Sequence, residues 1–317
     1  MIKKKIFCTL GPSSLNPSFL NFSNKKVDLL RLNMSHVKID RLEKYIKFIR
    51  KYSKVPICID TEGAQIRSKV KKEKFYKKNS KLEISNNKNF TLYPKTVFEQ
   101  IRAGDILDIG FDGLKLQIKK KTKNSLIGKV INQGKLENNK GIHVVNRKIK
   151  LNFITDKDKD AIKIGKKNKI KNYALSFVNS SEDIKKFNKI LPKENKIFKL
   201  ETKSAVQNLS SLYKTGDNFL IDRGDLSKEI GIENVPIIQR KILKLAKNKR
   251  KKIYIATNFL ESMITKNFPT RAEVNDIFNA LELGASGIVL AAETAIGKFP
   301  ESCVIFLKKI FKNFNKL

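Results

Sequence analysis

The fold is decided by a pattern that residues 218–226, NFLIDRGDL, show in its simplest form. A short apolar run, Asn218–Ile221, is followed at once by polar residues and a glycine. A continuous apolar run of this length is typical of a strand that is buried on both faces, as in a parallel sheet covered by helices. The polar residues that follow it are then expected at the carboxyl end of the strand.

The same pattern recurs seven more times along the chain. The other predicted strands are Lys5–Thr9, Val27–Leu32, Val55–Ile59, Asn172–Phe177, Lys196–Leu200, Lys252–Ala256 and Gly287–Leu290. Most of the gaps between them have the length and periodicity of helices, which we expect at Ile39–Tyr52, Lys157–Lys167, Glu182–Ile190, Val235–Ala246, Glu273–Leu283 and, as a closing helix, Ile305–Leu317. This alternation predicts an α/β fold, a closed (β/α)8 TIM barrel.

The gap between Ile59 and Asn172 departs from this rhythm. Much of it alternates with a period of two, as in Asp105–Ile109, Leu114–Ile118 and Ser125–Asn132, with a hairpin turn at 110–113. Such alternation is typical of antiparallel strands. We therefore expect a small all-β domain at 68–145, inserted after the third barrel strand, with residues 1–67 and 146–317 forming the barrel.

The composition of the chain excludes several classes of protein. Of 317 residues, 40% are hydrophobic, which excludes a disordered chain, and no apolar run is long enough to span a membrane. The three cysteines are far apart, so we expect neither disulfides nor a zinc cluster, and the start of the chain lacks the apolar core of a secretory signal. These features predict a cytoplasmic protein.

The formal net charge is +37, which indicates either a polyanionic partner or a drift of composition toward lysine. Only ten of the 67 basic residues are arginine, although arginine is favoured where phosphates or guanine edges are recognised. We therefore expect non-specific affinity for polyanions and no specific nucleic-acid partner.

Active sites of barrels form at the carboxyl ends of the strands. Lys199 and Glu201 share one face of their strand, and Asp225 follows the next strand along the chain. Glu201 and Asp225 could chelate a hard divalent cation such as Mg²⁺, with Lys199 neutralising phosphate charge beside it. Backbone N–H groups of Gly224 and Asp225 at a helix start would form an anion seat.

Two structural alternatives remain open at this point. Lys199 and Glu201 could form an ordinary buried ion pair. Thr270 and Glu273 have the spacing of a helix capping box, which we interpret as structural.

Several longer motifs together resemble the pyruvate kinase family over almost the whole chain. They are KIFCTLGPSS (5–14), RLNMSH (31–36), DTEGAQIR (60–67), ATNFLESMI (256–264), PTRAE (269–273) and ETAIGKFP (293–300). The resemblance implies transfer of the phosphoryl group of phosphoenolpyruvate to ADP, giving pyruvate and ATP in glycolysis. It also implies that the small β domain closes as a lid.

The resemblance also implies roles for individual residues. The catalytic residues would be Lys199, Thr257 and Arg31, and phosphoenolpyruvate would be bound by Lys199, Gly224, Asp225 and Thr257. Mg²⁺ or Mn²⁺ would be held by Glu201 and Asp225. The nucleotide would lie along Arg31, His36, Arg67 and Lys140, and a K⁺ site would consist of Asn33, Ser35, Asp60 and Thr61.

Departures from the family pattern leave some of these implications open. Gln65 replaces a glutamate that accompanies K⁺ dependence, so K⁺ activation is left open. Asp222 replaces a small residue, and Ala291-Ala292 replaces Ser-Gly. The chain ends after the eighth strand and one helix, so the regulatory C-terminal domain of the family is expected to be absent, while a homodimer through the barrel stays open. The alternatives are a degenerate paralogue that binds ligand without turnover and a basic polyanion-binding protein.

Overall fold

A computed structural model describes residues 4–316 of the chain, apart from 86–87, 111–112, 146 and 148. The chain divides into two compact units. The first consists of Met1–Gly63 and Asp156–Leu317, and the second of Ala64–Thr155. The sequence placed the insertion at 68–145. The second unit begins earlier because Ile66 and Arg67 already pair with β12 (Gly141–Val144).

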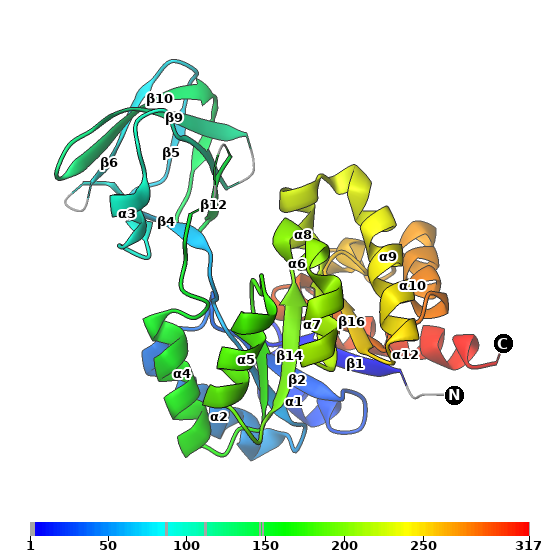
Figure 1. The fold of residues 1–317 in the computed structure, drawn as a ribbon. Coiled ribbons are helices and arrows are strands. Elements are labelled where there is room, and N and C mark those ends of the chain that lie inside the picture. Colours follow the sequence, from blue (N-terminus) through cyan, green and yellow to red (C-terminus); the bar gives the residue numbers. More distant parts are fainter. Residues whose placement is uncertain (1–3, 86–87, 111–112, 146, 148, 317) are drawn as a thin grey trace. The chain divides into compact units, whose positions relative to one another are not determined.

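The first unit is a closed barrel of parallel strands with helices around it (Figure 1). The strands are β1 (Lys5–Thr9), β2 (Leu29–Asn33), β3 (Ile57–Asp60), β13 (Asn172–Leu175), β14 (Asn195–Leu200), β15 (Asn218–Asp222), β16 (Lys252–Ala256) and β17 (Gly287–Leu290). Each pairs in parallel with the next, and β1 pairs with β17 to close the circle. The predicted (β/α)8 barrel is therefore confirmed.

Some strand ends differ from the prediction. β3 begins at Ile57 because Pro56 has no N–H to donate to the sheet, although its carbonyl accepts from the backbone N–H of Leu30 at 2.9 Å. β13 ends at Leu175, and two residues later Phe177 takes a φ of 54°, which turns the chain out of the sheet.

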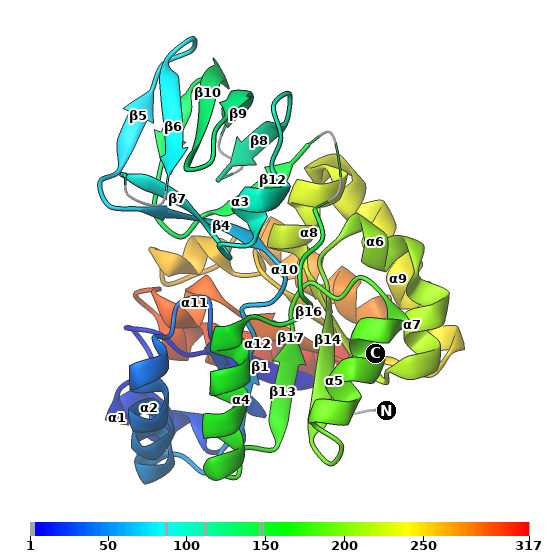
Figure 2. The ribbon, with the colours of Figure 1, turned by 60° about the vertical axis from the view of Figure 1, so that its left-hand side comes forward.

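Helices cover the outside of the barrel. They are α1 (Pro17–Ser23), α2 (Ile39–Tyr52), α4 (Asp156–Lys167), α5 (Ser181–Ile190), α6 (Lys203–Gln207), α7 (Leu209–Thr215), α8 (Arg223–Ile230), α9 (Val235–Asn248), α10 (Arg271–Glu282), α11 (Ala292–Ala295) and α12 (Pro300–Phe314), with 3-10 turns at Ile232–Asn234 and Glu261–Ile264. α2 has the predicted bounds, and it packs beside α4 (Figure 2). Its buried residues Leu42, Ile46 and Ile49 recur at helical spacing and form its inner face.

The predicted capping box at the start of α10 is confirmed. The Thr270 hydroxyl accepts from the backbone N–H of Glu273 at 3.2 Å, and the Glu273 carboxylate accepts from the backbone N–H of Thr270 at 2.7 Å. Two backbone donors that would otherwise lack partners at the helix start are thereby satisfied.

The inside of the barrel contains a buried apolar layer to which every strand contributes. Its members are Phe7, Leu29, Cys58, Ala174, Ile197, Leu220, Tyr254, Ala256 and Val289. Because side chains alternate along a strand, the residue two positions later points in the same direction. On six strands that next residue is polar and buried: Thr9, Arg31, Asp60, Ser176, Lys199 and Asp222. A polar layer thus lies on the apolar one, toward the carboxyl ends of the strands.

The second unit is a small β domain. Its larger sheet has the order β6 (Lys81–Ser85), β10 (Ser125–Asn132), β9 (Leu114–Lys121), β8 (Ile106–Ile109), β12, β4 (Ile66–Val70) and β7 (Phe90–Tyr93). A smaller sheet pairs β5 (Lys74–Tyr76) with β11 (Gly134–Leu136), and α3 spans Val97–Gln100.

The predicted alternation of this domain is visible in β9, where Leu114, Leu116 and Ile118 are fully buried. β8 and β9 pair antiparallel as expected, whereas Phe111 and Asp112 of the predicted turn lie outside the described residues. Among the residues that the structure covers, no helix combines the length and apolar character needed to cross a bilayer. The three cysteines are buried and free.

Candidate active site

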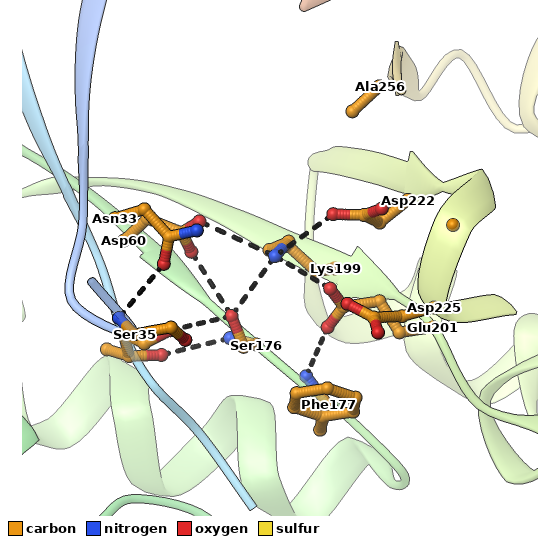
Figure 3. Close-up of polar contacts among 12 residues, drawn as sticks. Asn33, Ser35, Asp60, Ser176, Phe177, Lys199, Glu201, Asp222, Asp225 and Ala256 are labelled. Atoms are coloured by element: carbon orange, nitrogen blue, oxygen red, sulfur yellow. Dashed lines mark hydrogen bonds and ion pairs between the residues drawn. The ribbon is translucent and has the colours of Figure 1, made fainter. Parts of the chain in front are cut away.

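Lys199 is the centre of the polar layer. Its ammonium lies 2.6 Å from Glu201 Oε1, 3.4 Å from Asp60 Oδ2 and 3.4 Å from Asp222 Oδ2 (Figure 3). It also donates to the hydroxyl of Ser176 at 3.2 Å. Burial acts to lower the pKa of Lys199, but the three carboxylates outweigh it and raise the pKa above its usual range. Lys199 is therefore a fully charged cation in a site that excludes most water.

Arg31 and Asp60 form a second buried ion pair beside it. The Arg31 Nε and Nη2 atoms lie 2.7 and 2.5 Å from Asp60 Oδ2, and Nη1 donates to the Thr9 hydroxyl at 2.8 Å. The other oxygen of Asp60 accepts from the Ser176 hydroxyl at 3.2 Å. Both oxygens of Asp60 are thus already engaged by neighbouring side chains.

Three carboxylates gather on one side of Lys199. Glu201, Asp222 and Asp225 each offer an oxygen, and these oxygens lie within 4.8 Å of one another. Burial raises the pKa of Glu201 above its usual range against the opposing effect of Lys199, and the charges of Asp222 and Asp225 add to the increase. Such a group of hard oxygen donors with surplus negative charge fits a divalent cation of the Mg²⁺ type.

The residues expected to form an anion seat lie where β15 passes into α8. The backbone N–H of Gly224, in the first turn of α8, donates to the hydroxyl of Thr257 at 2.9 Å, and that hydroxyl lies 2.6 Å from the Ala256 carbonyl oxygen. A Cβ added to Gly224 would have only the ends of the Asp222 and Thr257 side chains near it, at 3.6 Å. Backbone N–H groups at a helix start favour an anion in such a position.

Thr257 is held in a backbone conformation that β-branched residues rarely adopt, with a φ of 75°. Arg223 stabilises it, because Nε and Nη2 of Arg223 donate to the Thr257 carbonyl at 3.1 and 2.6 Å. Arg223 is itself fixed by Asp276 at 2.6 Å and by the ring of Phe259, whose centroid is 3.9 Å from the guanidinium carbon. These contacts aim the Thr257 hydroxyl toward Gly224.

Comparisons with known proteins agree with this geometry. Residues 1–304 match the family model described as pyruvate kinase, barrel domain. The chain belongs to the pyruvate kinase family. It is 33% identical to a pyruvate kinase of Thermotoga maritima over all of this chain and 72% of that protein, and 34% identical to one of Methanocaldococcus jannaschii over 98% of this chain and 69% of that protein. It is also 33% identical to plastidial pyruvate kinase 2 of Arabidopsis thaliana over 94% of this chain and 55% of that protein. The chain thus spans little more than half the length of some relatives.

The residues that the pyruvate kinase resemblance assigns to a K⁺ site lie at the ends of β2 and β3. Asn33 Oδ1 accepts from the backbone N–H of Ser35 at 3.0 Å (Figure 3). Thr61 Oγ1 accepts from the backbone N–H of Ser176 at 3.0 Å, and Asp60 contacts Arg31 and Lys199 as described above. The side chains of Asn33, Asp60 and Thr61 thus each have a protein partner.

The expected nucleotide residues are divided between the two units. Arg31 is buried in the polar layer, whereas His36, on the loop after β2, is exposed. In the second unit Arg67 lies on β4 and pairs with Gly141 on β12. Lys140 directly precedes Gly141 and therefore lies near Arg67. Arg67 Nη1 donates to the carbonyl of Asn139 at 3.4 Å, and Lys140 lies 3.4 Å from Glu137.

Sequence reasoning assigned no site role to two residues that the structure places in this polar layer, Ser176 and Asp222. Ser176 contacts both Lys199 and Asp60, and Asp222 contacts Lys199. The sequence contained a usable signal: both residues stand two positions after an apolar residue of the barrel interior. Their partners, however, come from other strands, and no local pattern specifies them.

Proposed function

We propose that this chain transfers the phosphoryl group of phosphoenolpyruvate to ADP, forming pyruvate and ATP. One observation carries the proposal: a buried lysine ammonium contacts Glu201, which belongs to a cluster of three carboxylates at the carboxyl ends of the barrel strands. The names of the relatives agree with it. Phosphoryl transfer depends on positioning and charge neutralisation rather than on a covalent nucleophile, and this site offers both.

In this proposal Lys199 stabilises the negative charge of the phosphoryl group during transfer. The backbone N–H groups at the start of α8, at Gly224 and Asp225, and the Thr257 hydroxyl bind the substrate carboxylate. Thr257 lies beside the position where the enolate gains a proton. Arg31 contributes positive charge toward the phosphate, and the nucleotide lies along Arg31, His36, Arg67 and Lys140.

Glu201 and Asp225 would hold the divalent cation, Mg²⁺ or Mn²⁺, because their oxygens are hard donors beside the anion seat. A bound divalent cation supplies charge neutralisation at the phosphate. K⁺ would bind among Asn33, Ser35, Asp60 and Thr61, and its contribution to turnover is left to experiment because Gln65 departs from the family pattern.

The experiment is release of pyruvate from phosphoenolpyruvate and ADP with Mg²⁺, with and without K⁺. We expect turnover that chelation of Mg²⁺ abolishes and that Lys199→Met reduces to background. Turnover retained in Lys199→Met would refute the assignment. A folded protein that binds phosphoenolpyruvate or ADP without turnover would instead identify the degenerate paralogue that the motif substitutions leave open.

Two cavities at the amino-terminal end of the barrel strands favour polyanion binding as a second candidate function. One has a volume of about 500 Å³, and the other of about 350 Å³. Among apolar and neutral residues, the charged lining residues of the first are Lys4, Lys25, Lys26, Lys54, Lys308 and Asp28, and those of the second are Arg50, Lys54, Lys169 and Lys171. Lysine offers point charges without geometric selectivity, so we expect binding without sequence preference. Titration of a single-stranded RNA at increasing salt tests it. A steep loss of affinity with salt would show that RNA binding is only a by-product of the positive charge. Affinity retained at high salt would indicate a separate function.

A further inference from the structure

Asp222 is the carboxylate of this site to which the family resemblance gives no role. It ends β15, is only 6% exposed, and its Oδ2 atom lies 3.4 Å from the ammonium of Lys199. The inference drawn from it rests on the proposed function, and it concerns how Lys199 is positioned.

The ammonium of Lys199 occupies a position that competes with a divalent cation. One oxygen of Glu201, Oε2, accepts from the backbone N–H of Phe177 at 2.6 Å. The other, Oε1, is the oxygen that Lys199 contacts at 2.6 Å. A cation bound to Glu201 through Oε1 would repel the ammonium at that oxygen, so we expect the ammonium to move toward another carboxylate within reach.

Two carboxylates other than Glu201 lie at 3.4 Å from the ammonium, but they are not equivalent. Oδ2 of Asp60, the oxygen that faces the ammonium, already accepts from Arg31 at 2.7 Å. The ion pair that Asp222 forms, by contrast, is with Lys199 itself. Figure 3 shows the ammonium of Lys199 paired with both Glu201 and Asp222. Asp222 is thus the carboxylate that can accept the displaced ammonium with the smallest disruption of existing contacts.

We propose that Asp222 is a positioning residue for Lys199: it receives the ammonium when Glu201 binds the divalent cation, and so keeps Lys199 aimed at the phosphoryl group. The same charge lies beside the anion seat, since Asp222 Oδ1 is 3.6 Å from the place where a Cβ on Gly224 would be. It therefore repels the substrate carboxylate. Asp222 thus raises the rate of phosphoryl transfer by keeping Lys199 in position, and it weakens the binding of phosphoenolpyruvate.

The first test is a double-mutant cycle on Mg²⁺ binding to the whole chain without substrate, measured by isothermal titration calorimetry. In the unsubstituted chain, Asp222→Asn is expected to weaken Mg²⁺ binding about tenfold or more, because Lys199 then stays on Glu201. In the Lys199→Met background the competitor is gone, so the same substitution is expected to weaken binding by no more than about threefold. An equal loss in both backgrounds would overturn the proposal and identify Asp222 as a direct ligand.

The second test is kinetic and requires only Asp222 variants, so it remains available if Lys199→Met does not fold. Asp222→Asn is expected to lower kcat about tenfold without raising the KM for phosphoenolpyruvate, and Asp222→Glu to restore much of kcat. Asp217→Asn, just before the other end of β15, serves as the matched control, because its side chain is 84% exposed. A raised KM with unchanged kcat would contradict the proposal. If the unsubstituted chain forms no pyruvate, the proposed function fails while the Mg²⁺ cycle still decides the role of Asp222.

Discussion

Substitution of Lys199 by methionine tests the site most directly, because the structure predicts an effect on stability as well as on turnover. The ammonium is 4% exposed and faces carboxylates at 2.6, 3.4 and 3.4 Å. Removing one partner of a buried ion pair costs about 3–5 kcal/mol, because the remaining charges stay buried without compensation. For a domain of this size that corresponds to a fall in Tm of roughly 6–20 °C.

The pH dependence of this loss follows from the carboxylates that remain. Lys199 opposes the rise in the pKa of Glu201, so without Lys199 this carboxylate is more easily protonated, and a protonated carboxyl carries no charge to compensate. The destabilisation is therefore expected to be larger at pH 8 than at pH 6. Lys199→Met combined with Asp222→Asn removes both charges of one contact, so the double variant should melt at a higher temperature than Lys199→Met alone.

The assay is thermal unfolding followed by circular dichroism, together with release of pyruvate. The turnover number is expected to fall by about 10³-fold, the effect of removing a donor that stabilises transition-state charge. Lys251→Met is the control, because its partner Asp217 is 84% exposed and such pairs contribute about 0–1 kcal/mol. A Lys199→Met variant that melts with the unsubstituted protein, or retains a tenth of its turnover, would refute the reasoning.

Three further substitutions test other parts of the chain. Burial would raise the pKa of Asp105, but hydrogen bonds from Arg147 and from the backbone of residue 102 keep it below its ordinary value, so its stabilising effect is present above pH of about 4 and is lost as the pH falls further. Asp105→Asn should therefore be less resistant to urea than the unsubstituted chain at pH 7, with a smaller gap at pH 3. Thr270→Ala should cost about 1 kcal/mol in thermal unfolding, with turnover unchanged, since the hydroxyl caps α10; a loss of turnover in a folded sample would point to a site role instead. Arg223→Met should raise the activation free energy of turnover by more than it lowers the free energy of unfolding, because Arg223 orients Thr257. A variant with normal kcat would contradict this role.

The pattern of charge suggests how the chain keeps a functional site despite its composition. Lysine accounts for most of its positive charge, yet the polar layer contains Arg31 and a single lysine, Lys199, each surrounded by acidic partners. A buried cation without a carboxylate would be costly, and among the residues that the structure describes every lysine other than Lys199 is at least partly exposed to solvent. The exposed charge therefore reports little about the chemistry inside the barrel.

Much of the barrel was predictable because its causes are local. Continuous apolar runs and the amphipathic spacing of segments such as Ile39–Tyr52 follow directly from the requirement to bury one layer and cover it with another. The ends of β3 and β13 were less predictable. They depend on Pro56 and on the positive φ of Phe177, which change the backbone without changing the apolar pattern.

The sequence by itself determined that polar groups would face inward at the carboxyl ends of the strands, since alternation along each strand fixes the direction of Arg31 and Lys199. Only the tertiary structure decided which groups meet. Lys199 on β14 reaches Asp60 on β3 across the intervening β13, and Asp222 on the other neighbouring strand. Closure of the barrel sets these distances, because the stagger between strands determines which inward residues share a layer. The physical reason that Asp222 escaped prediction is therefore that its direction is local while its partner is not.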